Sequence, residues 1–171
     1  FFNEDTRAAG VTTSSSELTD GTTGKCLVMI TPDAERTMNT FLGISETIDE
    51  SQLDEDAIKQ SEYVYLEGYL VTSPSGKQAA IKAREIAEAN NIKTALTLSD
   101  PGMVQFFGDG LREMAGDKVD LIFCNKDEAL GWTKTDNIED AAEKMKNSAN
   151  TFAITLGKDG ALVFDGTTMT I

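Results

Sequence analysis

An asparagine and a glutamate three residues apart, Asn125 and Glu128, are the first candidates for chemistry in this sequence. They follow residues 119–124, a short apolar run rich in β-forming residues, which predicts a buried strand. The Asn-x-x-Glu spacing is typical of a helix start, with Asn125 as the N-cap and Glu128 reaching back to it. A strand that leads into a capped helix places backbone N–H groups at the carboxyl edge of a sheet, where α/β proteins bind phosphates. A purely structural capping box is the alternative, and the two roles are compatible.

Polar residues also follow three other runs that predict strands: Glu67-Gly68, Ser99-Asp100, and Thr155 with Gly157. Because the carboxyl ends of parallel strands share one edge of a sheet, we expect these groups to converge on one crevice with Asn125. Carboxylates suit magnesium or its bound waters, whereas hydroxyl, amide and backbone N–H groups suit phosphate oxygens. For residues 155–160 a plain β-turn is the alternative interpretation.

Helices and strands alternate from residue 49 onward. We expect strands at 63–66, 94–98, 119–124 and 151–156, and helices at 54–61, 74–90, 103–114, after Asn125, and at 137–146. Strands that are apolar on both faces and separated by helices predict a mostly parallel sheet covered on both sides. The expected fold class is therefore α/β with three layers, α/β/α.

The first quarter of the sequence has a different pattern. Residues 3–9 predict the end of a helix that stops at Gly10, followed by a short strand at 11–13 and a Ser/Thr/Gly-rich connection at 14–24. Two further strands, at 26–30 and 36–42, are joined by a predicted turn at 32–35. These pieces predict a small antiparallel β unit near the start of the chain.

The composition excludes several classes of function. A net charge of −14 over 171 residues argues against nucleic acid and against anionic membranes as partners, because both would be repelled. No apolar run approaches the length of a membrane span. With no histidine, His-based catalysis and most zinc sites are excluded within these residues. Cys26 and Cys124 lie in apolar strand-like runs, which predicts buried, reduced thiols in a cytoplasmic protein; a disulfide or a metal site is the minor alternative.

Five segments, in this order along the chain, together resemble one known family. They are residues 23–40, with the stretch Glu-Arg-Thr-Met, then 65–69, 97–101, 125–128 and 155–160. The sequence resembles the ribokinase-like (PfkB) carbohydrate kinases, and within them the adenosine-kinase-like bacterial sugar and nucleoside kinases. The resemblance implies transfer of the γ-phosphoryl group of ATP to a hydroxymethyl group of a sugar or nucleoside, with Mg²⁺ as the metal.

The resemblance also implies roles for particular residues. Asn125 and Glu128 resemble the family's Asn-x-x-Glu motif, in which Glu128 would hold Mg²⁺ through water. The strand end with Thr155, Gly157 and Gly160 resembles the part that contacts the nucleotide. The early β unit resembles the substrate lid, and Arg36 in it is expected to meet substrate or phosphate, with a solvent-facing lid arginine as the alternative. Asp100 is expected on the substrate side of the site.

The expected domain organisation follows from the resemblance. Residues 11–45 form the small β lid, with residues 1–10 leading into it from the core domain, and residues 46–171 form part of the α/β core. The family's amino-terminal sugar-binding glycine pair and its Gly-Ala-Gly-Asp element, with the anion hole and catalytic base, are not in this sequence. The chain is thus expected to be a fragment, with no catalytic residue of its own and with the base downstream of Ile171. A homodimer formed through the lid is a further expectation.

Three alternatives remain open from the sequence. The parent protein could be a kinase for another substrate, such as fructose, ribose, inosine or a ketodeoxy acid. It could also be a catalytically silent ribokinase-like binding or scaffold protein. In the third interpretation the strand ends hold only caps and turns of an unrelated α/β domain.

Overall fold

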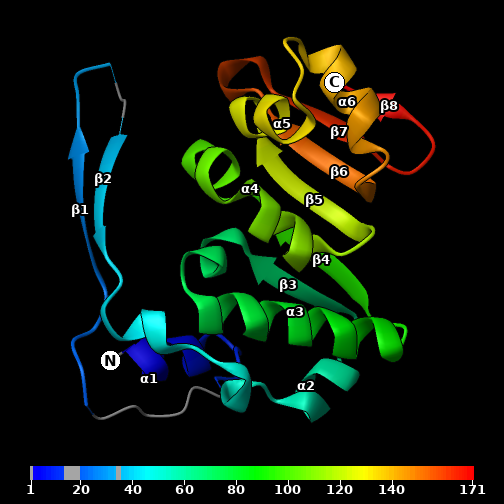
Figure 1. Ribbon diagram of the computed structural model, residues 1–171. Helices are drawn as coiled ribbons and strands as arrows, with labels where there is room; N and C mark the ends of the chain where they lie inside the picture. The colour runs from blue at the N-terminus through cyan, green and yellow to red at the C-terminus, as the bar shows by residue number, and fades with distance from the viewer. Residues whose placement is uncertain (1, 14–19, 34–35) are drawn as a thin grey trace.

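The structure, a computed structural model, describes residues 2–13, 20–33 and 36–171. Its α-helices and strands, with short 3₁₀ turns (η) between some of them, are shown in Figure 1. In chain order they are α1 (Phe2–Ala8), β1 (Lys25–Ile30), β2 (Arg36–Phe41), η1 (Gly43–Thr47), η2 (Glu50–Gln52), α2 (Glu55–Lys59), β3 (Tyr63–Glu67), η3 (Gly68–Thr72), α3 (Pro74–Ala89), β4 (Lys93–Thr97), α4 (Pro101–Ala115), β5 (Val119–Asn125), α5 (Lys126–Thr133), α6 (Ile138–Met145), β6 (Ala149–Thr155), η4 (Gly157–Asp159), β7 (Ala161–Phe164) and β8 (Met169–Thr170).

The larger sheet has six strands in the order β3-β4-β5-β6-β7-β8. Strands β3 to β6 pair in parallel, and β7 and β8 extend the sheet with antiparallel pairs. The α/β class with a mostly parallel sheet and a separate small β unit is therefore confirmed. Since each parallel strand lies beside the previous one, right-handed crossovers carry the connecting helices to the same face of the sheet. Contacts of α3 with α4, of α4 with α5 and of α5 with α6 show that these helices form one continuous layer.

The burial of the strand residues agrees with helices that cover only one face of the sheet. Side chains that face the helices are fully or almost fully buried, among them Leu66, Leu96, Ile122, Phe152 and Leu162. On the opposite face, exposed side chains include Tyr63, Tyr65, Phe123 and Val163. The described residues thus supply one of the two helical layers that the strand pattern predicts.

The starts of the helices agree with local sequence signals. Ser73 caps α3 by accepting a hydrogen bond from the Gly76 N–H, and Pro74 occupies the first turn, so α3 begins where the helix at 74–90 was predicted. Helix α4 begins earlier than predicted, at Pro101, because Asp100 accepts a hydrogen bond from the Gly102 N–H at 2.7 Å and acts as the N-cap. An Asp-Pro pair is itself a helix-start signal, so this boundary was readable from the sequence.

The small unit is an antiparallel ribbon of β1 and β2, which stands beside the sheet on the left in Figure 1. Every residue of both strands is exposed, since no second layer among the described residues covers the ribbon. The expectation of a buried Cys26 is therefore wrong: its thiol is free and exposed, whereas Cys124 is free and buried as predicted.

A second expectation for this region is also wrong. Residues 11–13 form no strand, because they lie next to no neighbouring strand that could supply ladder hydrogen bonds. Of the predicted connection and turn, residues 14–19 and 34–35 lie outside the described residues. In the part of the chain that is described, no helix is long and apolar enough to cross a membrane.

Candidate phosphate-facing site at the strand edge

The carboxyl ends of the parallel strands lie side by side at one edge of the sheet, on the side that faces the ribbon (Figure 1). The register pairs Glu67 with Thr97 and Asn125 with Thr155 at the ends of their strands. The structure therefore brings together the polar groups that end four separate strands, as the sequence predicted.

Asn125 and Glu128 form a complete capping box at the start of α5. The Asn125 side-chain oxygen accepts from the Glu128 N–H at 2.9 Å. The Asn125 backbone N–H donates to one Glu128 carboxylate oxygen at 2.9 Å, and its Nδ2 donates to the other at 2.7 Å. Each carboxylate oxygen keeps acceptor capacity beyond these bonds, so the cap leaves Glu128 able to accept from a water or a ligand.

Glu128 is an acid in an unfavourable place for its charge. Its side chain is only 4% exposed. Burial is the largest cause that raises the pKa of Glu128, and the nearby charges of Asp100, Asp127 and Glu67 raise it further, while the Asn125 backbone hydrogen bond opposes the shift. A cation near this edge would relieve both the repulsion and the desolvation of the carboxylate.

Glu67 and Ser99, both named from the sequence as polar groups at strand ends, form a second polar pair at the edge; their hydrogen bond was not predicted. The Ser99 hydroxyl donates to the Glu67 carboxylate across neighbouring strand ends. Ser99 has a φ of 70°, a left-handed conformation that is uncommon for a residue with a side chain. Its backbone N–H donates to the Thr97 hydroxyl at 3.2 Å, which helps to hold this turn.

Tyr69 is a site residue that the sequence analysis missed. Burial raises the pKa of Tyr69, and the charges of Asp100, Glu67, Glu128 and Cys26 raise it further. Tyr69 lies in η3, two residues after the end of β3, and together with Glu67 it lines a small hollow beside η1. Its place just after Glu67-Gly68 at a strand end was the available signal.

Thr155 is the last residue of β6, and Gly157 and Gly160 lie in the tight turn that follows. The Leu156 N–H donates to the Gly160 carbonyl at 2.8 Å, and the Gly160 N–H donates to the Gly157 carbonyl at 3.3 Å. Gly157 and Gly160 have φ values of 62° and 93°, which glycine adopts without strain. The segment after Thr155 is a 3₁₀ turn, η4 (Gly157–Asp159), and contact with a nucleotide stays a prediction for these residues.

Arg36 and Asp100 lie in different parts of the structure. Arg36 is exposed at the tip of the ribbon, opposite Ile30, and no hydrogen bond or ion pair joins it to the strand ends within the described residues. Asp100 caps α4 and is electrostatically coupled to Glu128. Of the two predicted substrate-side residues, only Asp100 is at the sheet edge.

The donor set fits magnesium held through its waters better than magnesium held directly. Among the described residues, no group of three or more Asp, Glu, Cys or His side chains is arranged to hold a metal ion. Single carboxylates of Glu128, Glu67 and Asp100 nevertheless gather at the edge. Mg²⁺ retains several waters in phosphate sites and often uses one or two protein carboxylates, so this arrangement suits that mode of binding.

Fold and site together define an α/β protein whose parallel strand ends bring carboxylates, amides and a helix start together at one edge of the sheet. The family model for the pfkB family of carbohydrate kinases matches residues 1–171. The chain belongs to the pfkB family of carbohydrate kinases.

Individual relatives agree with this membership. A solved adenosine kinase from Sinorhizobium meliloti is 33% identical, with a TM-score of 0.90 over 99% of this chain and 52% of that chain. The guanosine-inosine kinase of Escherichia coli K12 is 26% identical over 144 residues, which are 82% of this chain and 33% of that protein. The adenosine kinase of Anopheles gambiae, solved with P1,P4-di(adenosine-5) tetraphosphate, shares the fold with a TM-score of 0.82 at 23% identity, covering 97% of this chain and 53% of that one. The chain thus spans about a third to a half of the length of these relatives.

Proposed function

We propose that the complete protein transfers the γ-phosphoryl group of ATP to a hydroxymethyl group of a nucleoside or related sugar, with Mg²⁺. The observation that carries the proposal is the Asn125–Glu128 capping box, with Glu128 buried, at an edge where Glu67 ends β3 and Asp100 caps α4 just after β4. Membership of a carbohydrate kinase family supports the reaction class. The names of the relatives, adenosine kinase and guanosine-inosine kinase, favour a nucleoside over a simple sugar as substrate.

The residues of the chain have separate roles in this proposal. Glu128 would hold a water of the magnesium ion, and Asn125 fixes the carboxylate through two hydrogen bonds. When bound, the metal would supply charge neutralisation for the transferring phosphoryl group. Thr155, Gly157 and Gly160 would contact the nucleotide, and Asp100 would face the substrate. Because phosphoryl transfer depends on positioning and electrostatics, a rigid cap is well suited to this work.

The ribbon is proposed as a lid that closes over the substrate and excludes water from the transfer. The proposed division places the lid at residues 11–45, with 1–10 leading into it and 46–171 in the core. Arg36, at the ribbon tip, would reach substrate or phosphate only when the lid closes. Pairing of two ribbons in a homodimer also stays a proposal, supported by exposed apolar side chains such as Leu27 and Ile30; the molar mass from light scattering tests it.

The proposed setting follows from the co-substrate and the charge. ATP as phosphoryl donor supports a cytoplasmic location. The net charge of −14 supports small-molecule partners in place of nucleic acid or anionic membrane. Kinases for another sugar such as fructose or a ketodeoxy acid, and a catalytically silent binding protein, remain the competing proposals.

The test is Glu128→Gln in the complete protein, assayed for ATP consumption with a panel of nucleosides and sugars. We expect magnesium-dependent turnover to fall by about 10- to 100-fold, as for residues that support a metal indirectly. Asp127→Asn is the matched control, because it removes one negative charge from the neighbouring exposed position of the same helix turn. No turnover of any nucleoside or sugar by the wild-type protein, or equal activity of wild type and Glu128→Gln, would contradict the proposal.

A further inference from the structure

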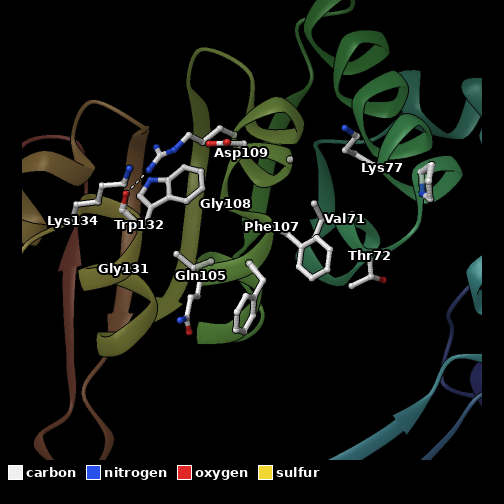
Figure 2. A pocket seen from close by; sticks show the side chains of 15 residues that line it. Val71, Thr72, Lys77, Gln105, Phe107, Gly108, Asp109, Gly131, Trp132 and Lys134 are labelled. Atoms are coloured by element: carbon white, nitrogen blue, oxygen red, sulfur yellow. Dashed lines mark hydrogen bonds between the residues drawn. The ribbon is translucent and has the colours of Figure 1, made fainter.

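A cavity of about 620 Å³ lies among the helices, outside the set of residues at the strand edge (Figure 2). Residues of η3, α3, α4 and α5 line it, and none of Glu67, Asp100, Asn125 or Glu128 is among them. Its volume is within the range of about 300–1,000 Å³ that is usual for small-molecule sites.

A break in α4 shapes the cavity. Phe107 departs from helical geometry, with φ of −125° and ψ of 18°. The two aromatic side chains at the break line the cavity and remain in contact with solvent, Phe106 at 74% and Phe107 at 39% exposure. Gly108 follows directly, and a Cβ added there would meet open space. The cavity thus has two accessible aromatic rings and a wall without a side chain.

The charge on the cavity wall is opposite to that of the protein. The chain carries −14, yet the lining contains Lys77, Arg112 and Lys134 against one carboxylate, Asp109. Lys77 pairs with Glu113 at 2.6 Å. Arg112 and Lys134 make no ion pair with any carboxylate in the described ranges 2–13, 20–33 and 36–171. These two cations are therefore available to an anion.

Arg112 is held in position without being neutralised. Its guanidinium lies over the Trp132 ring, 4.1 Å from the ring centre, and it donates a hydrogen bond to the Trp132 carbonyl. A guanidinium has five N–H donors, so most remain for a ligand. A neighbouring hollow of about 280 Å³ shares Arg112 and Lys134 and adds Lys144 to the same positive surface.

We propose that this cavity is a second ligand site, separate from the strand edge, for a small anionic molecule of nucleotide chemistry. Arg112 and Lys134 bind its phosphate, because a planar guanidinium matches two phosphate oxygens at once. Phe106 and Phe107 pack against its planar base, since aromatic faces stack with heteroaromatic rings. A ligand that has only the phosphate or only the planar base makes only half of these contacts.

The chain carries its own reporter for this site. Trp132 is the one tryptophan among the 171 residues, and it lines the cavity beneath Arg112. The experiment titrates the full chain with adenosine 5′-monophosphate and follows tryptophan fluorescence, with adenosine and inorganic phosphate as separate probes. We expect a saturable change with the nucleotide, and at least tenfold weaker binding of each of the two partial probes.

Variants assign the binding to this cavity. Arg112→Gln and Lys134→Gln should each weaken nucleotide binding at least tenfold, and Gly108→Leu should block it by filling the open space, whereas Gly108→Ala should bind normally. Lys118→Gln is the matched control, because it removes the same charge from an exposed lysine outside the cavity. Lys134→Gln and Gly108→Leu leave the Arg112–Trp132 contact in place. These two variants therefore test whether the nucleotide binds in the cavity even if Arg112→Gln disturbs folding.

Several results would overturn the proposal. A wild-type chain that gives no saturable fluorescence change has no such site. Equal affinity of the nucleotide for wild type, Lys134→Gln and Gly108→Leu would place the binding elsewhere. If Lys118→Gln lowered the affinity for the nucleotide as much as Lys134→Gln, the binding would be a non-specific attraction to positive charge. If Glu128→Gln weakened nucleotide binding while the cavity variants bound normally, the nucleotide would bind at the strand edge and not in the cavity. This outcome leaves the kinase proposal intact.

Discussion

Glu128 shows how one residue takes a structural and a chemical role at the same time. Its carboxylate accepts from the backbone and the side chain of Asn125, which stabilises the start of α5. The same carboxylate is almost fully buried among other acids, so its ionised form is disfavoured. Capping alone needs no such burial, because it depends only on the hydrogen bonds between the N-cap residue and the residue three positions later. The burial therefore favours a second role for the charge.

A prediction about pH follows from this burial. The pKa of Glu128 is raised above its usual value of 4.5, so folded chains keep a proton that unfolded chains have released. The contribution of Glu128 to the free energy of unfolding should thus be largest below about pH 4.5 and should fall as pH rises through the raised pKa. Glu128→Gln removes this titration. Urea unfolding from pH 4 to pH 8 should show a smaller decline with pH for Glu128→Gln than for the wild type.

The control for that measurement is Glu139→Gln, which changes an exposed carboxylate in the first turn of α6 that is not among the charges raising the pKa of Glu128. In this variant the free energy of unfolding should decline with pH as it does in the wild type. An identical pH dependence of wild type and Glu128→Gln would contradict the assigned cause. Magnesium together with ATP should restore part of the stability of the wild type at neutral pH, where the buried charge is present.

At the scale of elements, helix starts are the features that the sequence predicted best. Caps at Ser73, Asn125 and Asn137 are each present, with the side chain accepting from a backbone N–H in the first turn. Each of these bonds joins residues three positions apart, so local sequence contains all the information they need. The ribbon strands were also predicted, but their exposure was not, because exposure depends on what else packs nearby.

Two asparagine caps allow structure and activity to be separated. Asn125→Ala and Asn137→Ala should each lower the free energy of unfolding by about 1 kcal/mol, because each leaves a helix without its cap. Only Asn125→Ala should also lower the proposed kinase activity, since Asn137 begins α6 and takes no part in the strand edge. Urea unfolding and ATP consumption of the complete protein measure the two effects. Similar activity losses in both variants would mean that the cap acts on turnover only through stability.

At the scale of the whole molecule, the two thiols should report the difference between the ribbon and the core. Cys26 is exposed on the ribbon, while Cys124 is buried in β5 and burial raises its pKa to about 12. A thiol reagent at neutral pH should therefore modify Cys26 quickly and Cys124 only on unfolding, because the thiolate is the reactive form. Peptide mass spectrometry identifies the modified residue. Cys26→Ser should remove the fast reaction, and fast labelling of Cys124 in the folded chain would contradict the burial assigned here.

The order of strands explains why the molecule has one helical layer in the described residues. Each crossover runs in the same direction along the sheet, so α3 to α6 gather on one face. Tyr65 and Phe123 on the other face remain exposed. The apolar pattern of the strands predicted burial on both faces, but the pattern contains no information on which segment provides the cover.

The sequence by itself determined the α/β class, the separate β ribbon, the strand ends and the capping box of Asn125 and Glu128. These features depend on local periodicity and on hydrogen bonds between near neighbours, which a short window of sequence contains. Only the tertiary structure decided that Ser99 bonds Glu67, that Tyr69 joins the acidic edge, and that Cys26 is exposed. It alone showed that the break at Phe107 opens a cavity lined by cations. Each of these depends on residues far apart in the chain, whose contact is set by packing and not by spacing.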